Sequence, residues 1–293
     1  MADMSSTENN LLFAVPKKGR LHDQVVKFLN GAGLDYTRPH RLDIAHCSSL
    51  PVTVVFLPAS DIAAYVGEGN VDLGITGQDI IAESQTTVNE LMNLGFGKCS
   101  LSVQAPITSA IKDPALLAGK RIVTSFPNVA REYFKQFEVP GKPTHIKYVG
   151  GSVEAACGLG LADGIVDLVE TGTTMKAAGL EIVSNIMKTE AVLISNPNTK
   201  HRKLVNKIHQ RLLGFLFAQK YRMISYNIAR EKLQKAITIT PGRKAPTINP
   251  LLNEDFCAVS AMVPRNDVAD IMDDLHELGA TDIFVLDIEN CRA

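Results

Sequence analysis

The chain has 293 residues, 45% of them hydrophobic and 21% charged, and a formal net charge of −1. This composition describes a soluble globular protein with enough core for two or three domains. Because the charge is near neutral and no basic block occurs, the sequence offers no electrostatic footprint for nucleic acid, and an anionic ligand must be held by local groups.

Residues 1–10 are polar and lack the basic and apolar regions of a secretory signal, and no later apolar run approaches the ~18 residues that span a bilayer. We therefore expect a cytoplasmic protein without a membrane anchor. The five cysteines are widely separated and form no CxxC pair, which argues against a disulfide framework or a zinc site. We interpret them as reduced packing residues.

The N-terminal third alternates strands with helices, as in a largely parallel sheet. Strands are expected at 11–15, 52–57 and 71–76, and helices at 21–32 and 60–68. Ser60 or Asp61 is a suitable N-cap for the second helix. The turn 16–20 after the first strand carries Lys17, Lys18 and Arg20.

A second alternating set follows. Its expected elements are helices at 114–118, 129–137 and 153–161, with strands at 121–124, 146–149 and 165–169. Apolar segments at 101–105 and 191–195 bracket this set, so the second lobe is expected to be inserted into the first through two hinge strands. Substrates would then bind between the lobes.

The C-terminal part begins with a helical pattern at 199–219, which we expect to connect to the first lobe. Beyond it, a βαββαβ pattern predicts a ferredoxin-like domain. Its strands are expected at 222–228, 248–252, 257–263 and 282–288, and its helices at 230–236 and 268–278.

The predicted fold class is α/β, with a two-lobed core like that of periplasmic binding proteins and a C-terminal ferredoxin-like domain. Lobe I is predicted to comprise residues 1–104 and 184–218, lobe II residues 105–183, and the last domain residues 219–293.

The segment from Asp167 to Met175 is a buried-strand pattern that ends in small residues with hydroxyls and unobstructed amides. Thr171, Gly172, Thr173 and Thr174 can donate hydrogen bonds without adding bulk, and a helix starting near Met175 would favour an anion at its N-terminus. These features are typical of a phosphate-binding loop. An ordinary polar turn with a threonine cap is the alternative.

Residues 69–77 align without gaps to residues 164–172, with six of nine positions in agreement. Convergence of strand-then-turn segments on the same few residues would explain this echo. The other interpretation is that each lobe presents an equivalent loop to the cleft. In the first lobe, Asp72, Gly74 and Gly77 would then contact a flat ligand.

A wider set of residues around the loop has the spacing of a family signature. Its members are Glu154, Gly160, Ala162, Ile165, Asp167, Leu168, Thr171, Gly172, Thr174 and Met175. The chain resembles ATP phosphoribosyltransferase, and the resemblance extends from Leu11 to the C-terminus. It implies that this segment binds the 5′-phosphate and ribose of phosphoribosyl pyrophosphate, the sugar donor for the first step of histidine biosynthesis.

The resemblance implies transfer of the phosphoribosyl group to N1 of the adenine of ATP, with Mg²⁺, giving 1-(5-phosphoribosyl)-ATP and pyrophosphate. It also implies that the C-terminal domain is the regulatory module of the long form, which binds histidine as an inhibitor. Members of the family form dimers and hexamers, so we expect a homo-oligomer.

Candidate anion ligands in lobe I are Lys17, Arg20 and Arg41, which match the family's Lys-x-Gly-Arg turn and Arg-Leu pair. Arg20 is the strongest of them because a guanidinium makes bidentate phosphate contacts. Lys18 is interpreted as a surface residue. The echo loop of lobe I is assigned to ATP.

In lobe II, either Asp167 or Glu154 could hold ribose hydroxyls or Mg²⁺. Glu154 could equally be an acid that stabilises a helix N-terminus. Gly151 and Ser152, at a strand-to-helix junction, and Ser125 are further candidates for anion or ribose contacts.

The seven histidines form no HxxxH or triad pattern, and no general base is assigned. Metal ligands also remain unassigned. Thr247, in the Gly/Pro/Thr loop of the last domain, is a candidate effector contact. Many relatives carry an Asp where this chain has Asn227, so a different charge is expected beside an amino ligand.

A binding module is the second hypothesis, because two hinged lobes also describe solute receptors and a ferredoxin-like tail could sense an amino acid. Such a receptor normally needs export, and it would not require a threonine-rich loop together with basic turns.

Overall fold

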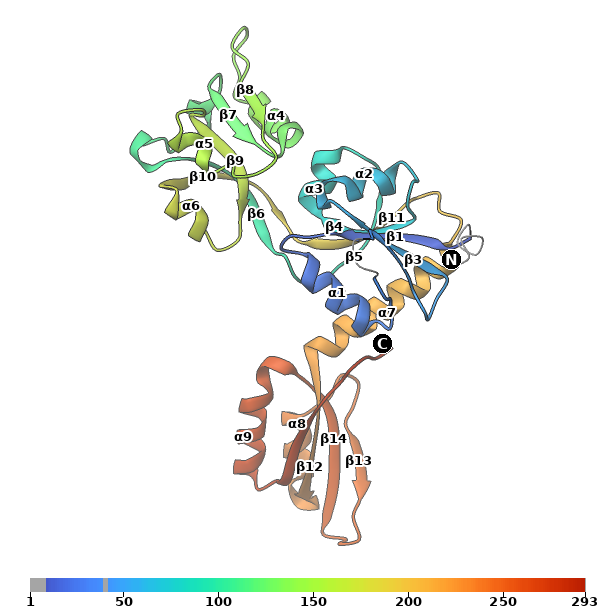
Figure 1. Ribbon diagram of the computed structural model, residues 1–293. Coiled ribbons are helices and arrows are strands. Elements are labelled where there is room, and N and C mark those ends of the chain that lie inside the picture. Colours follow the sequence, from blue (N-terminus) through green and yellow to red (C-terminus); the bar gives the residue numbers. More distant parts are fainter. Residues whose placement is uncertain (1–8, 39–41, 293) are drawn as a thin grey trace. The chain divides into compact units, whose positions relative to one another are not determined.

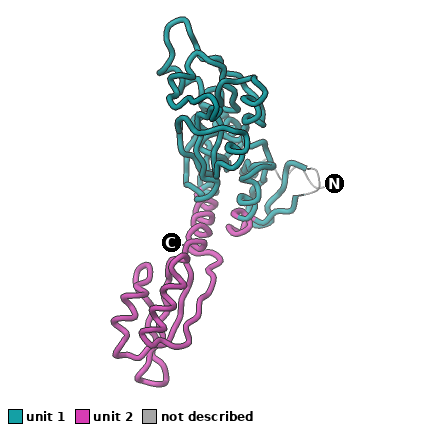
Figure 2. Tube along the Cα trace, turned by 90° about the vertical axis from the view of Figure 1, so that its left-hand side faces the viewer, with its two compact units in different colours: residues 1–27, 35–205 teal, residues 28–34, 206–293 magenta. Residues whose placement is uncertain are grey.

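A computed structural model describes residues 9–38 and 42–292 of the chain (Figure 1). The chain divides into two compact units (Figure 2). Unit 1 holds Met1–Lys27 and Asp35–Val205, and unit 2 holds Phe28–Leu34 and Asn206–Ala293. Most of both predicted lobes lies within unit 1, but residues 28–34 and 206–218, which were predicted to belong to lobe I, are part of unit 2 together with the predicted C-terminal domain.

Lobe I is built on a six-stranded sheet with the order β2-β3-β1-β4-β11-β5. Its strands are β1 (Leu11–Pro16), β2 (Ile44–His46), β3 (Val52–Leu57), β4 (Leu73–Gly77), β5 (Asn89–Asn93) and β11 (Ala191–Ser195). β1 pairs in parallel with β3 and β4, whereas β11 is antiparallel to β4 and β5. β4 and β11 are buried at every residue, which explains their unbroken runs of small and apolar side chains.

Lobe II is built on a five-stranded sheet with the order β10-β6-β9-β7-β8. Its strands are β6 (Cys99–Pro106), β7 (Arg121–Thr124), β8 (His145–Tyr148), β9 (Gly164–Val169) and β10 (Leu180–Thr189). β7 is parallel to β8 and β9, while β6 is antiparallel to β9 and β10. The three parallel strands therefore end at the same edge of the sheet.

The chain passes between the two sheets twice, at residues 94–98 between β5 and β6 and at Glu190 between β10 and β11. The predicted lobe boundaries at 104 and 184 fall inside β6 and β10. Both strands pair within the second sheet. The lobe boundaries therefore lie at residues 94–98 and 190, and not at 104 and 184. The chain thus connects the lobes twice, but the predicted hinge strands at 101–105 and 191–195 lie within the sheets, in β6 of lobe II and β11 of lobe I, and the connections themselves are short non-strand segments.

Helices cover the sheets and fill the connections (Figure 1). They are α1 (His22–Gly31), α2 (Ile62–Gly67), α3 (Gln78–Ser84), α4 (Pro127–Lys135), α5 (Ala155–Gly158), α6 (Thr173–Ala177), α7 (Arg202–Lys220), α8 (Leu233–Ile239) and α9 (Val268–Leu278). Short 3₁₀ turns occupy Ala59–Asp61, Ile107–Ser109, Pro114–Leu117, Arg230–Lys232 and Arg265–Asp267. The helix predicted at 114–118 is thus a 3₁₀ turn, and the one predicted at 153–161 is reduced to one turn.

The cap predicted for the second helix does not form. Asp61 occupies the N-cap position of α2, but its side chain makes no capping hydrogen bond. Instead the Ser60 hydroxyl donates to Asp61 Oδ1 at 2.8 Å, so the two polar side chains satisfy each other.

Unit 2 contains a four-stranded antiparallel sheet with the order β13-β14-β12-β15. Its strands are β12 (Tyr221–Ala229), β13 (Thr247–Pro250), β14 (Phe256–Pro264) and β15 (Thr281–Asp287). Its apolar core includes the fully buried Tyr226, whose hydroxyl is hydrogen-bonded to Thr240 Oγ1 at 2.7 Å. The βαββαβ order and this strand arrangement are those of a ferredoxin-like domain.

The same unit includes most of α7 and the end of α1. Phe215 of α7 packs edge-on against Phe28, with ring centroids 5.2 Å apart. Gly31 lies so close to Phe215 that a Cβ there would come within 2.0 Å of its ring. Near the chain end, Asn290 Nδ2 donates to the Gly31 carbonyl at 2.8 Å.

The predicted fold class is confirmed: an α/β core of two lobes is followed by a ferredoxin-like domain. In the described residues, none of the helices combines the length and apolarity needed to cross a membrane.

Candidate active site

The threonine-rich loop connects β9 to α6, in lobe II. Gly172 has φ +76° and occupies the N-cap of α6, a left-handed conformation that favours glycine at this position. Because the cap residue is glycine, the loop is not the threonine-capped turn considered from the sequence. The Thr171 and Thr173 hydroxyls lie 3.0 Å apart, and all three threonines are exposed. The loop thus presents hydroxyls and first-turn N–H groups to a ligand.

A pocket with a volume of ≈ 290 Å³ lies against this loop. Its lining is Leu168, Val169, Glu170, Thr171, Gly172, Thr173, Thr174 and Met175 from lobe II, together with Arg20 and Cys99. Arg20 comes from the turn after β1 in lobe I, and its Nη1 donates to the Gly97 carbonyl at 2.9 Å. The structure therefore brings the predicted guanidinium and the predicted phosphate loop to one cavity.

A second pocket, with a volume of ≈ 400 Å³, shares Cys99, Val169 and Glu170 with the first. Its other lining residues are Gln78, Lys98, Ser100, Lys188, Thr189 and Glu190. Lys98 and Lys188 were not singled out in the sequence. They flank the two crossings between the sheets, and no local motif could have shown that these crossings lie beside the loop.

Asp167 is the most perturbed acid beside the loop. Burial raises its pKa to about 6; a hydrogen bond from Leu168 N to Oδ1 at 2.8 Å opposes the rise, and the charge of Glu154 adds to it. Glu154 occupies the N-cap position of α5, and its side chain makes no capping hydrogen bond there. The position of Glu154 at the N-terminus of α5 agrees with the alternative interpretation of an acid that stabilises a helix N-terminus, although it makes no capping bond.

The parallel strands of lobe II bring further predicted residues to the same sheet edge. Ser125 follows β7, Gly151 and Ser152 follow β8, and the threonine loop follows β9. Ser152 is exposed and has φ +50°, an uncommon conformation for a residue other than glycine. The adjacent Thr124 is buried instead, and its hydroxyl donates to the Val166 carbonyl at 2.7 Å. Thr124 therefore supports the sheet rather than facing a ligand.

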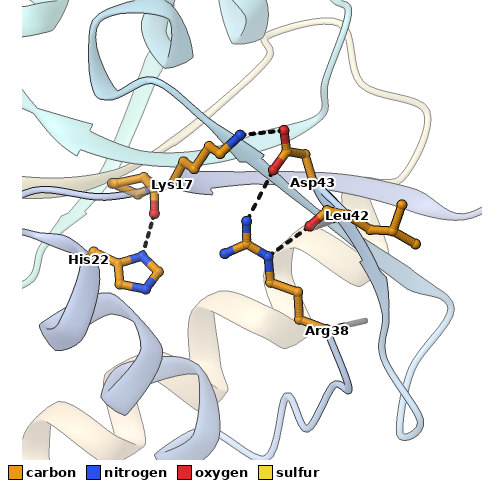
Figure 3. A network of polar contacts seen from close by, with 6 residues as sticks. Lys17, His22, Arg38, Leu42 and Asp43 are labelled. Atoms are coloured by element: carbon orange, nitrogen blue, oxygen red, sulfur yellow. Dashed lines mark hydrogen bonds and ion pairs between the residues drawn. The ribbon is translucent and has the colours of Figure 1, made fainter. Parts of the chain in front are cut away.

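Lys17 belongs to a polar network in lobe I (Figure 3). Its Nζ lies 2.7 Å from Asp43 Oδ2, and Arg38 Nη2 lies 3.1 Å from Asp43 Oδ1. The Lys17 hydrogen bond is the main reason that the pKa of Asp43 is lowered. Arg38 also stacks on Phe56, with its guanidinium carbon 3.9 Å from the ring centroid. Arg38 was missed from the sequence, and Arg41 lies outside the described residues.

The first-lobe echo does not form the predicted ligand loop. Gly77 and Gly172 each occupy the N-cap of the following helix, so part of the likeness is structural. However, β4 continues to Gly77, which pairs with Ala191, whereas β9 ends at Val169 and leaves a loop. The strand of lobe I therefore runs directly into α3.

The residues predicted to contact a ligand in this echo also have structural roles. A Cβ on the buried Gly74 would come within 2.8 Å of Ile62 and Val66 in α2. A Cβ on Gly77 would come within 2.0 Å of the Asp79 carboxylate. Asp72 accepts hydrogen bonds from Leu12 N at 3.0 Å and from the Thr199 hydroxyl at 2.5 Å. Close packing and hydrogen bonding within lobe I are thus sufficient to explain these three residues, and their contact with a ligand stays a prediction.

In the C-terminal domain, Thr247 is exposed at the start of β13 and pairs with Ser260 of β14. Asn227 of β12 donates to Asp282 Oδ2 at 2.9 Å. Asp282 has φ +52° at the start of β15. A carboxylate is thus present beside Asn227, although the family resemblance led us to expect a different charge there.

The cysteines of the chain are free thiols. Cys99 and Cys257 are buried, and burial raises the pKa of both Cys47 and Cys157 to about 11, which keeps these thiols protonated at neutral pH. Within residues 9–38 and 42–292, no group of three or more His, Cys, Asp or Glu side chains is arranged to hold a metal ion without a substrate.

Comparison with known proteins shows the family to which the chain belongs. Residues 58–214 match the family model described as ATP phosphoribosyltransferase (HisG), and residues 218–290 match the model described as the HisG C-terminal domain. The chain is 50% identical over 292 residues to the ATP phosphoribosyltransferase of Yarrowia lipolytica, covering 99% of each chain. It is 48% identical to that of Saccharomyces cerevisiae, covering 97% of each.

Among solved structures, the ATP phosphoribosyl transferase (HisG:HisZ) complex from Thermotoga maritima superposes with a TM-score of 0.63 and 27% sequence identity, over 71% of this chain and 98% of that one. Family models and relatives together span both units. The chain therefore belongs to the ATP phosphoribosyltransferase family, the pentosyltransferases of histidine biosynthesis, in its long form with a C-terminal domain.

Proposed function

We propose that the enzyme transfers the phosphoribosyl group of phosphoribosyl pyrophosphate to N1 of the adenine of ATP, giving 1-(5-phosphoribosyl)-ATP and pyrophosphate. The N1–C1′ bond forms while the C1′–O bond to pyrophosphate breaks, and pyrophosphate leaves with the bonding electron pair. The observation that carries this proposal is the ≈ 290 Å³ pocket in which Arg20 and the threonine loop line one space.

The loop from Thr171 to Thr174 is assigned to the 5′-phosphate. Hydroxyl groups and the N–H groups of the first turn of α6 all donate hydrogen bonds, and the small residues leave room for the three phosphate oxygens. Ser125, Gly151 and Ser152 lie at the same sheet edge and are assigned as supporting contacts to the sugar phosphate.

Asp167 and Glu154 are assigned to the ribose hydroxyls and to a magnesium ion bound with the substrate. The two carboxylates fit such an ion. Burial of Asp167, together with the charge of Glu154, raises the pKa of Asp167 to about 6, and a bound cation would stabilise its ionised form. Mg²⁺ would neutralise charge on the pyrophosphate group. Asp167 and Glu154 would also hold the ribose hydroxyls.

The second pocket is assigned to ATP and departing pyrophosphate. Lys98 and Lys188 supply positive charge there, and Arg20 stands in the adjoining pocket, which shares Cys99, Val169 and Glu170 with this one. Lys17 and Arg41 remain proposed contacts of the same substrate. Lys17 would have to exchange its ion pair with Asp43 for a phosphate. Because both partners are 45% exposed, that pair is weak and easily exchanged.

No general base is required in this mechanism. A neutral adenine nitrogen is already nucleophilic, and the sugar carbon gains positive charge as pyrophosphate departs. Positioning of the two substrates and electrostatic stabilisation of the leaving group can therefore supply the rate acceleration.

The C-terminal domain is proposed to bind histidine and inhibit the reaction. Thr247 offers a hydroxyl on an exposed edge strand, and Asp282 beside Asn227 supplies a carboxylate that could bind an α-amino group. We further expect the enzyme to work in the cytoplasm as a homo-oligomer, a dimer or a hexamer.

The test is a pyrophosphate-release assay with ATP, phosphoribosyl pyrophosphate and Mg²⁺, with and without histidine. Release of pyrophosphate together with an N1-substituted adenine nucleotide is expected, and histidine should suppress both. If neither product forms with any combination of substrates, the proposed reaction is wrong. A reaction that proceeds unchanged in the presence of histidine would refute only the regulatory part.

A further inference from the structure

Helix α3 belongs to lobe I, since it follows directly from β4, yet its side chains bond to lobe II at two points. Asp79, in its first turn, is 2% exposed, and its Oδ1 accepts a hydrogen bond from the Thr189 hydroxyl at 2.8 Å. Thr189 is the last residue of β10, beside the second crossing. Glu83, four residues further along, lies on the same face of the helix as Asp79.

The Glu83 carboxylate contacts the N-terminus of α4 in lobe II. Its two oxygens accept hydrogen bonds from Asn128 N, each at 3.0 Å, and Oε2 accepts another from Val129 N at 3.0 Å. The Asn128 side-chain amide also donates to the Glu83 carbonyl at 2.9 Å. One residue of lobe I therefore makes four hydrogen bonds to two residues of lobe II.

Helix α4 has no cap of its own. Its N-cap residue is Phe126, whose side chain cannot accept a hydrogen bond, and Pro127 has no N–H to satisfy. Ala130 N already bonds to the Phe126 carbonyl at 3.0 Å. The two remaining first-turn donors, Asn128 N and Val129 N, are the ones that Glu83 accepts, so the other lobe completes this helix terminus.

Apolar contacts between α3 and α4 cover only part of the interface between these two helices. Ile80 packs against the cores of both lobes. Farther along the helices, however, a hollow of ≈ 320 Å³ separates part of α3 from α4, and it is lined by Ala82, Gln85, Asn128, Val129, Glu132, Tyr133 and Ile186. The helix pair is therefore not sealed by apolar packing, and the hydrogen bonds of Glu83 are the main polar connection on this side.

The two attachment points of α3 respond differently to lobe movement. The Asp79–Thr189 bond lies at a crossing of the chain, where rotation of one lobe against the other displaces atoms least. Glu83 lies a helical turn farther from that crossing, so its bonds to α4 must break if the lobes open. α4 also leads back to the site, because Phe126 N donates to the Thr124 hydroxyl at 2.9 Å and that hydroxyl donates to Val166 O, beside Asp167.

We propose that Glu83 is an interlobe latch, a positioning residue that caps α4 from the other lobe and thereby fixes the lobes at the angle where Arg20 faces the threonine loop. The reaction it serves is the one proposed above, but the latch itself is a property of the free protein. Its partners are backbone amides, so its strength depends on the carboxylate and not on a second charged side chain.

The test compares Glu83→Gln and Glu83→Ala with the control Glu138→Ala. The Glu138 carboxylate also accepts a backbone hydrogen bond, from Thr144 N at 2.6 Å, but both residues lie within lobe II. Hydrogen exchange of residues 126–130 is measured in the free full-length protein. Lobe separation is measured between spin labels on non-natural residues at the exposed positions Asn70 and Lys120.

For Glu83→Ala we expect first-turn amides of α4 to exchange about tenfold faster, which corresponds to the loss of one helix cap. The spin-label distance distribution should broaden, and KM for phosphoribosyl pyrophosphate should rise about tenfold with a smaller change in kcat, because its proposed contacts come from both lobes. Glu83→Gln, which keeps an acceptor oxygen, should recover part of each effect. Glu138→Ala should change none of the three.

An unchanged distance distribution and unchanged exchange in Glu83→Ala would overturn the latch, as would equal effects in Glu138→Ala. If exchange and lobe separation change as expected while the wild-type chain shows no phosphoribosyl transfer, the latch stands and the proposed function is wrong.

Discussion

The hydroxyl groups of Thr171 and Thr173 are hydrogen-bonded to each other at 3.0 Å, so two of the three threonine side chains in the loop hold each other in position. Thr173 N lies 3.5 Å from the same Thr171 oxygen. The loop is therefore partly ordered by its own side chains. Thr174, in the first turn of α6 and lining the pocket, is the best position at which to test contact with substrate.

Replacing Thr174 by Val removes one donor to a phosphate while keeping the shape of the side chain. Because a hydrogen bond to a charged group contributes about 1.5–3 kcal/mol, KM for phosphoribosyl pyrophosphate should rise at least about tenfold. KM for ATP should change much less. Steady-state kinetics with each substrate varied in turn measure both constants, and Thr238→Val, on α8 in unit 2, is the matched control. Equal effects on the two substrates would contradict the assignment.

Replacing Arg20 by Lys keeps the positive charge but loses the planar fork. We expect about a tenfold fall in kcat/KM for phosphoribosyl pyrophosphate, since bidentate phosphate contact needs the planar guanidinium, and a lysine could not contact a phosphate in this way while also bonding to the Gly97 carbonyl. Lys18→Ala, in the same turn, should have no measurable effect. A fully active Arg20→Lys enzyme would mean that Arg20 supplies charge only.

The pH dependence of donor binding should follow Asp167. Its pKa is raised to about 6, so its carboxylate becomes neutral as the pH falls through about 6, and a neutral group binds a cation or ribose hydroxyls less well. KM for phosphoribosyl pyrophosphate should therefore rise between pH 7 and pH 5. The donor's own phosphates titrate in this range, so Asp167→Asn is the control, and its profile should be flatter. Parallel profiles would exclude Asp167.

The same pKa has a consequence for stability with the opposite sign. A buried carboxylate whose pKa is raised destabilises the folded state when ionised, so its contribution is most favourable below its ordinary pKa and is lost as the pH rises to about 6. The stability of Asp167→Asn, compared with that of the wild type at the same pH, should accordingly be greater at pH 7 than at pH 4. Denaturant unfolding of both proteins at the two pH values measures the difference.

Histidine inhibition should depend on Asp282. Changing it to Asn removes the carboxylate beside Asn227, and inhibition should weaken at least about tenfold while the uninhibited rate stays the same. Deleting the residues after Lys220 should abolish inhibition and leave α7 in place. Dose–response curves for histidine measure both variants. If a folded truncation is still inhibited, the effector site lies outside the C-terminal domain.

Gly74→Ala distinguishes packing from ligand contact in lobe I. The added methyl would meet Ile62 and Val66 at 2.8 Å, so unfolding free energy should fall by about 1–3 kcal/mol. KM for ATP, measured well below the melting temperature, should remain unchanged. Thermal unfolding and ATP kinetics provide the two readouts, and a raised KM with unchanged stability would restore the original ligand assignment.

Much of the order of elements could be predicted from the sequence because it depends on local patterns, although β2, β5, β10 and α3 were not predicted. Runs such as Val52–Leu57 and the βαββαβ series predict strands and helices from neighbouring residues alone, and the threonine loop combines small residues with hydroxyls over a short stretch. The threonine loop and Arg20 were singled out in this way, and one pocket is lined by both. Their binding of phosphate stays a prediction.

What could not be predicted depends on contacts between distant residues. Gly74 resembles a glycine that makes room for a ligand, but the atoms beside it belong to α2. Lys98, Lys188 and Glu83 have no local motif, because their positions follow from where the chain crosses between sheets and from which helix lacks a cap. Asp282 lies 55 residues from Asn227, so the replacement carboxylate could not be inferred from the segment around Asn227.

The position of β11 in the sheet of lobe I also constrains synthesis. This strand lies between β4 and β5, yet it follows all of lobe II in the chain. A ribosome that has completed lobe II has therefore not yet supplied the strand that joins β4 to β5. We infer that lobe II can fold first during translation, and that the sheet of lobe I is completed between β4 and β5 only after Ser195 has left the exit tunnel.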